Sequence, residues 1–115
     1  MLLPEPLATV TSKAFGICDE SEGAFNPGLY EAVERWGFGA SDQADPVASG
    51  LAFSQAREAA PSGTGLLQDS VLTKREGFAL DLNGIAKGYA VDLLCDVIRS
   101  HPDTAACFAE IGGEL

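Results

Sequence analysis

The amino-acid sequence predicts an α+β fold, in which helices pack against a mostly antiparallel sheet. Helical patterns fill the first part of the 115 residues, and a hairpin pattern, one long helix and a final strand follow them. Helices and strands that are segregated in this way are typical of α+β layers rather than of alternating α/β folds. The length suits a single domain over residues 1–115, with one modest hydrophobic core.

Three helices are predicted in the first half of the chain. The first spans about residues 7–20. After a turn at residues 26–27, a short helix over residues 29–36 ends at Gly37. A third begins with an aspartate and a proline, which suit a cap and a first helical position, and covers residues 46–59. Apolar residues of the first helix recur at the spacing of one face; they are Leu7, Val10, Ala14, Ile17 and Cys18.

The strands are predicted mainly in the second half. Residues 66–67 suggest a short strand, and residues 71–74 and 78–82 a β-hairpin;. The clearest helical pattern covers residues 84–100, and an apolar strand follows at residues 105–111. Four short strands make a small sheet for this many helices. We therefore expect the domain to be incomplete and the chain to be a fragment or a truncated gene product.

Charge excludes some classes of partner. Seventeen Asp and Glu against seven Lys and Arg give a net charge of −10, which is spread along the chain. No basic stripe exists for a nucleic-acid backbone, and no polybasic segment for an anionic membrane surface. The sequence has no apolar run of the roughly 20 residues that span a bilayer, and its start is not a signal peptide.

The cysteines and the single histidine suggest no metal site. Cys18, Cys95 and Cys107 contain no CxxC pair and are too few for a disulfide framework, so each is predicted to be a small buried hydrophobe;. His101 is the only histidine. A multi-histidine metal site and a Ser-His-Asp triad are therefore excluded.

Lys87 is placed unusually in the predicted helix 84–100. It falls in the first turn, where the positive end of the helix dipole disfavours a cation. At about 100° per residue it also projects from the apolar stripe, which contains Val91, Leu94 and Ile98. A bound phosphate would relieve both costs, because it would accept N–H groups at the helix start and pair with the ammonium.

The residues before Lys87 suit the same ligand. Asn83 is a candidate N-cap, Gly84 lets a ligand approach the backbone, and Asp81 ends the preceding strand;. The alternative is that Lys87 extends to water and pairs with Asp81 without any ligand. The pattern is neither a Walker loop nor a Rossmann fingerprint, so the residues by themselves leave both alternatives open.

Three segments together resemble one known family. Residues 80–92, "LDLNGIAKGYAVD", closely resemble the signature of the ApbE-type flavin transferases, the FAD:protein FMN transferases, also called the thiamine biosynthesis lipoprotein ApbE family. Residues 21–39, "SEGAFNPGLYEAVERWGFG", and residues 108–115, "FAEIGGEL", are similar to two further family motifs in the same order. The resemblance covers nearly all of this chain but only the middle of a full-length member.

The resemblance implies an enzyme. Family members bind FAD and Mg²⁺, cleave the pyrophosphate, and transfer FMN to a threonine or serine hydroxyl of an acceptor protein. It also implies a place in the cell envelope or periplasm, where many bacterial members are lipoproteins. Such phosphoryl transfer depends mainly on positioning and charge neutralisation.

The resemblance also assigns site residues. Asp81 and Lys87 match contacts to the flavin dinucleotide, and the main-chain carbonyl of Gly84 matches a metal ligand. Ala24, Phe25 and Asn26 match the upstream loop that touches the ligand. No catalytic residue is assigned. Trp36 and Phe38 are predicted either to line a flavin-facing wall or to pack in the core.

Departures from the family pattern keep other functions open. Asn26 stands where aspartate is usual, and the family's remaining metal ligands, an aspartate and a threonine, have no counterpart in this sequence. This leaves open whether the chain by itself is active. The alternatives are a flavin- or nucleotide-binding module without catalysis, and a ligand-free truncated domain completed by dimerisation through exposed strand edges.

Overall fold

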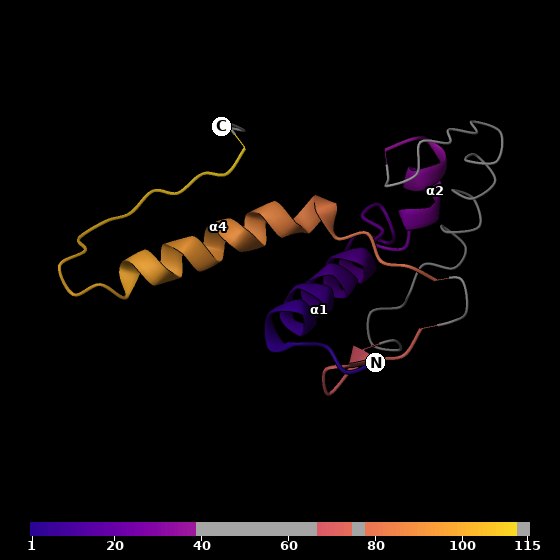
Figure 1. Cartoon of the computed structure of the whole chain (residues 1–115), viewed down its shortest axis with the longest axis horizontal. Helices are drawn as coiled ribbons and strands as arrows, with labels where there is room; N and C mark the ends of the chain where they lie inside the picture. The colour runs from indigo at the N-terminus through magenta and orange to yellow at the C-terminus, as the bar shows by residue number, and fades with distance from the viewer. Residues whose placement is uncertain (39–66, 75–77, 113–115) are drawn as a thin grey trace. The chain divides into compact units, whose positions relative to one another are not determined.

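The computed structural model describes residues 1–38, 67–74 and 78–112. The chain divides into two compact units, Met1–Leu82 and Asn83–Leu115, whose elements are drawn in Figure 1. The helix predicted at residues 46–59 lies outside the described residues. No helix within the described ranges is long and apolar enough to cross a membrane.

Helix α1, Glu5–Glu20, is the main helix of the first unit. It begins after Pro4, and Glu5 in its first turn interacts favourably with the helix dipole;. It ends in a Schellman motif, in which the N–H of Gly23 donates to the carbonyl of Cys18 at 2.8 Å;. Gly23 has a φ of 82°, which glycine adopts at little cost;.

The buried face of α1 differs from the predicted one. Val10, Ala14 and Cys18 are buried as expected, but Leu7 and Ile17 are 39% and 42% exposed. The buried positions also include Ala8, Thr11 and Phe15. The predicted face was wrong by about one residue, because a count of apolar side chains omits Thr11, whose methyl group and hydroxyl are fully buried.

A two-stranded antiparallel sheet packs beside α1. Strand β1, Leu67–Gln68, pairs with β2, Val71–Leu72. Asp69 and Ser70 form the turn with φ values of 49° and 63°, the signs that a type I′ hairpin requires. The chain's N-terminus joins this sheet, since the N–H of Leu3 donates to the carbonyl of Ser70 at 2.9 Å.

The predicted hairpin of residues 71–74 with 78–82 is therefore wrong. Val71 and Leu72 pair with the preceding strand, and residues 78–82 form no strand in the described part of the chain. The prediction relied on the glycine at position 77. The tight turn instead uses Asp69 and Ser70 in the left-handed region, where non-glycine residues give a weak sequence signal;.

The core of the first unit lies between α1 and the hairpin. Four buried side chains, Leu3, Ala8, Phe15 and Leu72, pack together, and the partly buried Leu67 and Leu80 pack against them. Leu80 connects this core to the segment that carries Asp81. The hydrophobic core thus positions the predicted ligand-binding segment.

Helix α2, Tyr30–Arg35, follows the turn predicted at residues 26–27. Its end confirms the prediction at Gly37, which has a φ of 82°. The N–H of Phe38 donates to the carbonyl of Val33 at 3.1 Å, which completes a second Schellman motif;. Arg35 and Glu31 form an ion pair along the exposed side of this helix.

The second unit consists of α4, Asn83–Arg99, and the residues that follow it. Residues 100–112, here called the return segment, run back along the helix (Figure 1). The Thr104 hydroxyl donates to the carbonyl of Ile98 at 2.9 Å. Farther back along the helix, the Cys107 sulfur lies 4.0 Å from the carbonyl oxygen of Cys95. The long helix confirms the sequence prediction to within one residue at each end.

The strand predicted at residues 105–111 is a second correction. These residues pair with no strand in the described part of the chain. No residue of α4 is buried either, and Val97 and Phe108 are 69% and 75% exposed. The apolar pattern at these residues indicates only a preference for burial. A strand forms only where a neighbouring strand pairs with it through hydrogen bonds.

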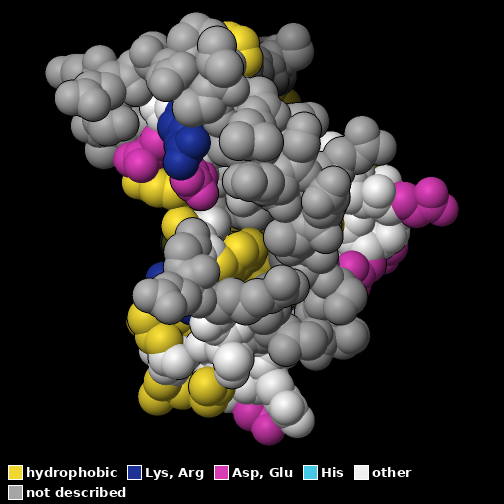
Figure 2. Space-filling model, turned by 90° about the vertical axis from the view of Figure 1, so that its right-hand side faces the viewer, with side chains coloured by type: hydrophobic (Ala, Val, Ile, Leu, Met, Phe, Trp, Pro, Cys, Tyr) yellow, Lys and Arg dark blue, Asp and Glu magenta, His cyan; other side chains and the backbone are white. Residues whose placement is uncertain are grey.

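Charged side chains are scattered over the surface. On the face shown in Figure 2, acidic side chains lie at several separate places and form no single patch. This agrees with the even spread of acidic residues along the sequence.

Candidate functional site

The upstream loop, residues 21–28, is held by its own hydrogen bonds. The Ser21 hydroxyl accepts the N–H of Phe25 at 3.0 Å. The Asn26 side-chain oxygen accepts the N–H of Gly28 at 2.8 Å, and Asn26 is buried. This Asx turn explains why asparagine suits the position. It also commits that oxygen to the loop, while Ala24 is exposed and Phe25 half-buried.

The structure brings Asp81 to this loop. The main-chain N–H of Asp81 donates to the carbonyl oxygen of Pro27 at 2.7 Å. Beside it, the ring of Phe78 lies so close to Gly28 that a Cβ atom on Gly28 would be 3.0 Å from it. Pro27 and Asp81, which belong to two of the motifs and are more than fifty positions apart in the sequence, are therefore joined by a hydrogen bond.

Negative charge gathers near Asp81. The Tyr30 hydroxyl donates to Glu34 at 2.7 Å. This hydrogen bond is the main cause that raises the pKa of Tyr30, and burial and the negative charges of Glu34 and Asp81 add to it. The carboxylate of Asp81 thus lies close enough to Tyr30 to affect its ionisation.

Lys87 lies in the second unit, next to the glycine pair of the third motif. An ideal Cβ on Gly112 would be 3.4 Å from the Lys87 ammonium nitrogen and 3.8 Å from its Cε. Gly112 has a φ of 97°, a conformation that side chains disfavour;. Gly112 thus leaves space for the lysine, a relationship that sequence reasoning missed because no spacing rule predicts it.

Two expectations about Lys87 are wrong. The residue is exposed rather than buried in an apolar stripe. Because α4 begins at Asn83 rather than at Gly84, Lys87 is its fifth residue and lies just beyond the first turn. Neither burial nor the dipole therefore argues strongly for an anion. For the same reason Asn83 is the first helical residue rather than the cap.

Gly84 is exposed in the first turn of α4. A main-chain carbonyl is a suitable oxygen donor for Mg²⁺, but such sites need further carboxylates or phosphates. Among the described residues, no group of three or more His, Cys, Asp or Glu is placed to hold a metal. The donors in this part of the chain do not by themselves make a Mg²⁺ site.

The aromatic residues after α2 are not core residues. Trp36 and Phe38 are 50% and 82% exposed. The core alternative is therefore wrong for both. A flavin-facing role for them stays a prediction.

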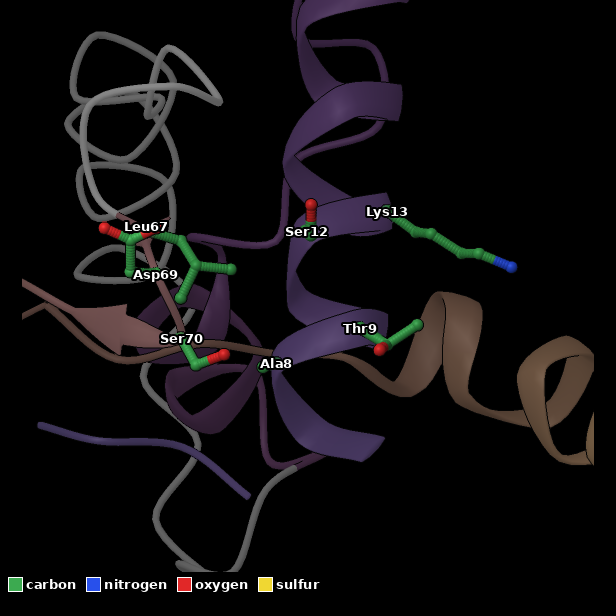
Figure 3. A pocket seen from close by; sticks show the side chains of 7 residues that line it. All are labelled: Ala8, Thr9, Ser12, Lys13, Leu67, Asp69 and Ser70. Atoms are coloured by element: carbon green, nitrogen blue, oxygen red, sulfur yellow. The ribbon is translucent and has the colours of Figure 1, made fainter. Parts of the chain in front are cut away.

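Two cavities of the first unit contain none of the predicted site residues. One, of about 380 Å³, is bordered by α1 and the hairpin; Figure 3 shows that Lys13 points away from its other lining residues. The second, of about 280 Å³, is mostly apolar and lies against the core. None of the predicted ligand residues lines either cavity.

The prediction for the cysteines holds only in part. Cys18 is buried, at 2% exposure. Cys95 and Cys107 are half-buried and lie beside each other. The sequence signal that could have found this pair is weak, since their spacing fits no known cysteine motif.

Relatives of this chain are flavin transferases. The FAD:protein FMN transferase of Treponema pallidum (strain Nichols) is 27% identical over 122 residues, which cover 100% of this chain and 33% of that protein. The FAD:protein FMN transferase of Rhodobacter capsulatus is 32% identical over 89 residues, or 76% of this chain and 17% of that protein. The chain therefore spans one third or less of the length of these relatives.

A solved structure of a flavinyl transferase resembles this chain in its fold. The apo crystal structure of the Pseudomonas stutzeri flavinyl transferase ApbE matches with a TM-score of 0.71 and 29% identity, over 87% of this chain and 33% of that one. The α+β class agrees with this likeness. The sequence model of the ApbE family matches residues 2–115. This chain belongs to the ApbE family.

Proposed function

We propose that the chain is part of an FAD:protein FMN transferase and supplies residues that hold FAD. In the proposed reaction a P–O bond of the FAD pyrophosphate breaks, AMP leaves, and a Thr or Ser hydroxyl oxygen of an acceptor protein forms a phosphoester with FMN. Both sequence relatives carry this activity in their names. Their partial overlap with this chain makes the activity of the whole protein a proposal.

The observation that carries the proposal is the hydrogen bond from Asp81 to Pro27. It joins the loop of Ala24, Phe25 and Asn26 to the segment that resembles the family signature. A carboxylate such as that of Asp81 accepts hydrogen bonds, which suits the hydroxyl and N–H groups of a dinucleotide. Asn26 contributes through its turn, which presents Ala24 and Phe25.

Lys87 supplies the positive charge in this proposal. Its ammonium would pair with the pyrophosphate and stabilise the charge that develops as the P–O bond breaks. The exposure of Lys87 and its place beside Gly112 support such a role, since a phosphate could approach without a Cβ atom in its way.

The proposal includes Mg²⁺ with the Gly84 carbonyl as one ligand. The cation would neutralise phosphate charge when bound. Further ligands, such as phosphate oxygens, would be needed, since the described residues hold no cluster of three or more metal-binding side chains. We further propose an envelope or periplasmic acceptor protein, in keeping with the resemblance.

The test uses the full chain with FAD. We expect FAD to bind, as seen by a change in flavin fluorescence, and Mg²⁺ with an acceptor peptide to release AMP. FAD binding without AMP release would instead support the binding module. Absence of any flavin binding at high FAD concentration would contradict both.

A further inference from the structure

Cys95 and Cys107 form a pair of neighbouring thiols in the second unit. The Cys107 sulfur lies 4.0 Å from the carbonyl oxygen of Cys95, across twelve positions of sequence. Burial is the main cause that raises the pKa of the Cys95 thiol, and the neighbouring Cys107 side chain adds to it. Both residues are half-buried, so small reagents can reach them.

Contacts on either side keep these thiols together. Toward the end of α4, the Thr104 hydroxyl donates to Ile98 at 2.9 Å. Toward its start, Gly112 lies against the side chain of Lys87. The order of these contacts shows that the return segment follows α4 antiparallel, and Cys107 meets Cys95 between them. The thiol contact is therefore part of a longer alignment.

We propose that Cys95 and Cys107 are a redox modification site, which closes to an intramolecular disulfide and holds the return segment on α4. The proposal goes beyond the proposed function and does not depend on it. The oxidant is a small-molecule disulfide such as oxidised glutathione. One cysteine thiolate attacks a sulfur of that disulfide and expels one thiolate. The second cysteine attacks the mixed disulfide and expels the other, so each oxidant yields two thiols.

Cys18 provides an internal contrast. It is 2% exposed in the first unit, whereas Cys95 and Cys107 are half-buried. An oxidant has to reach the sulfur to react with it, so the buried Cys18 should exchange slowly. The disulfide should therefore form between Cys95 and Cys107 and not involve Cys18.

The test is to oxidise the reduced, unsubstituted chain with oxidised glutathione, block remaining thiols and digest with trypsin without reductant. Cleavage after Lys87 and Arg99 places Cys95 in residues 88–99 and Cys107 in residues 100–115, while Cys18 falls in residues 14–35. We expect the first two peptides to be joined, in an intact monomer that has lost two hydrogen atoms, and dithiothreitol to separate them.

Substitutions identify the thiols. Cys18→Ser should keep the joined peptides, whereas Cys95→Ser and Cys107→Ser should each lose them and retain glutathione on the remaining partner. The result that overturns the proposal is recovery of residues 88–99 and 100–115 as separate peptides from the oxidised, unsubstituted chain. A disulfide to Cys18, or one between two copies of the chain, overturns it equally.

Discussion

The main-chain N–H of Asp81 donates a hydrogen bond of 2.7 Å to the carbonyl oxygen of Pro27. It fixes the segment before α4 on the upstream loop. The loop in turn is shaped by Asn26, whose side chain closes the turn at Gly28. The geometry of the proposed flavin surface in the first unit therefore depends on small features of this loop, and these can be changed one at a time.

Gly28→Ala should destabilise the chain. The new Cβ would lie 3.0 Å from the Phe78 ring and 3.1 Å from the Asn26 oxygen, and overpacking of this kind costs about 1–3 kcal/mol. Gly16→Ala is the matched control, because nothing lies within 4 Å of its Cβ and it is inside α1. There alanine should stabilise by about 0.5–1 kcal/mol. Urea denaturation measures both, and equal midpoints would refute the close contact at Gly28.

Asn26→Ala should also lower stability. It leaves the N–H of Gly28 without its acceptor in a buried turn, a loss worth about 1–3 kcal/mol. Asn26→Asp keeps an acceptor oxygen and should retain most of the stability. The free energy of unfolding of the two variants decides this, and an equal loss in both would argue that the amide N–H₂ group matters instead.

Thr11→Val should stabilise the chain. The Thr11 hydroxyl is fully buried, and it has no hydrogen-bond partner in the described part of the chain. Removing such a group while keeping its shape is worth about 1 kcal/mol. Thr9→Val, in the same helix but only half-buried, should change the midpoint little. A lower midpoint for Thr11→Val would mean that the hydroxyl is satisfied in solution.

Cys18 should make stability depend on alkaline pH. Burial, with a contribution from Asp19, raises the pKa of its thiol above the ordinary value of 9.0. Above that value the unfolded thiol ionises while the folded one keeps its proton. Its contribution is therefore complete below pH 9.0 and is lost as pH rises through the raised pKa;. The free energy of unfolding should fall less between about pH 8 and about pH 10 in Cys18→Ala than in the unsubstituted chain. Equal slopes of this free energy against pH would contradict the prediction.

Local sequence signals predict the helices well and the partners of strands poorly. The end of α2 at Gly37 follows from a backbone conformation that glycine favours;. The pairing of Val71 with Gln68 depends on a turn at Asp69 and Ser70. Many different residue pairs occupy such turns, so the sequence does not identify this one. The return segment shows the same limit, since its apolar residues indicate burial without saying what covers them.

The residues of the candidate site were predicted more from resemblance to the family motifs than from helical periodicity and charge. Asp81 was expected near the upstream loop only through the family motifs, because no periodicity connects residues so far apart. The physical argument for Lys87 assumed a buried helix face, which the structure does not have. Its closeness to Gly112 arises from the path of the return segment, a tertiary feature that helical geometry cannot predict.

The most direct test of the account is the affinity for FAD of Lys87→Ala compared with Lys13→Ala, an exposed lysine of α1. A hydrogen bond to a charged group is worth about 1.5–3 kcal/mol, so loss of Lys87 should weaken FAD binding by roughly tenfold or more. Lys13→Ala should leave the dissociation constant unchanged. Equal affinities of both variants and the unsubstituted chain would contradict the assignment of Lys87 to the pyrophosphate.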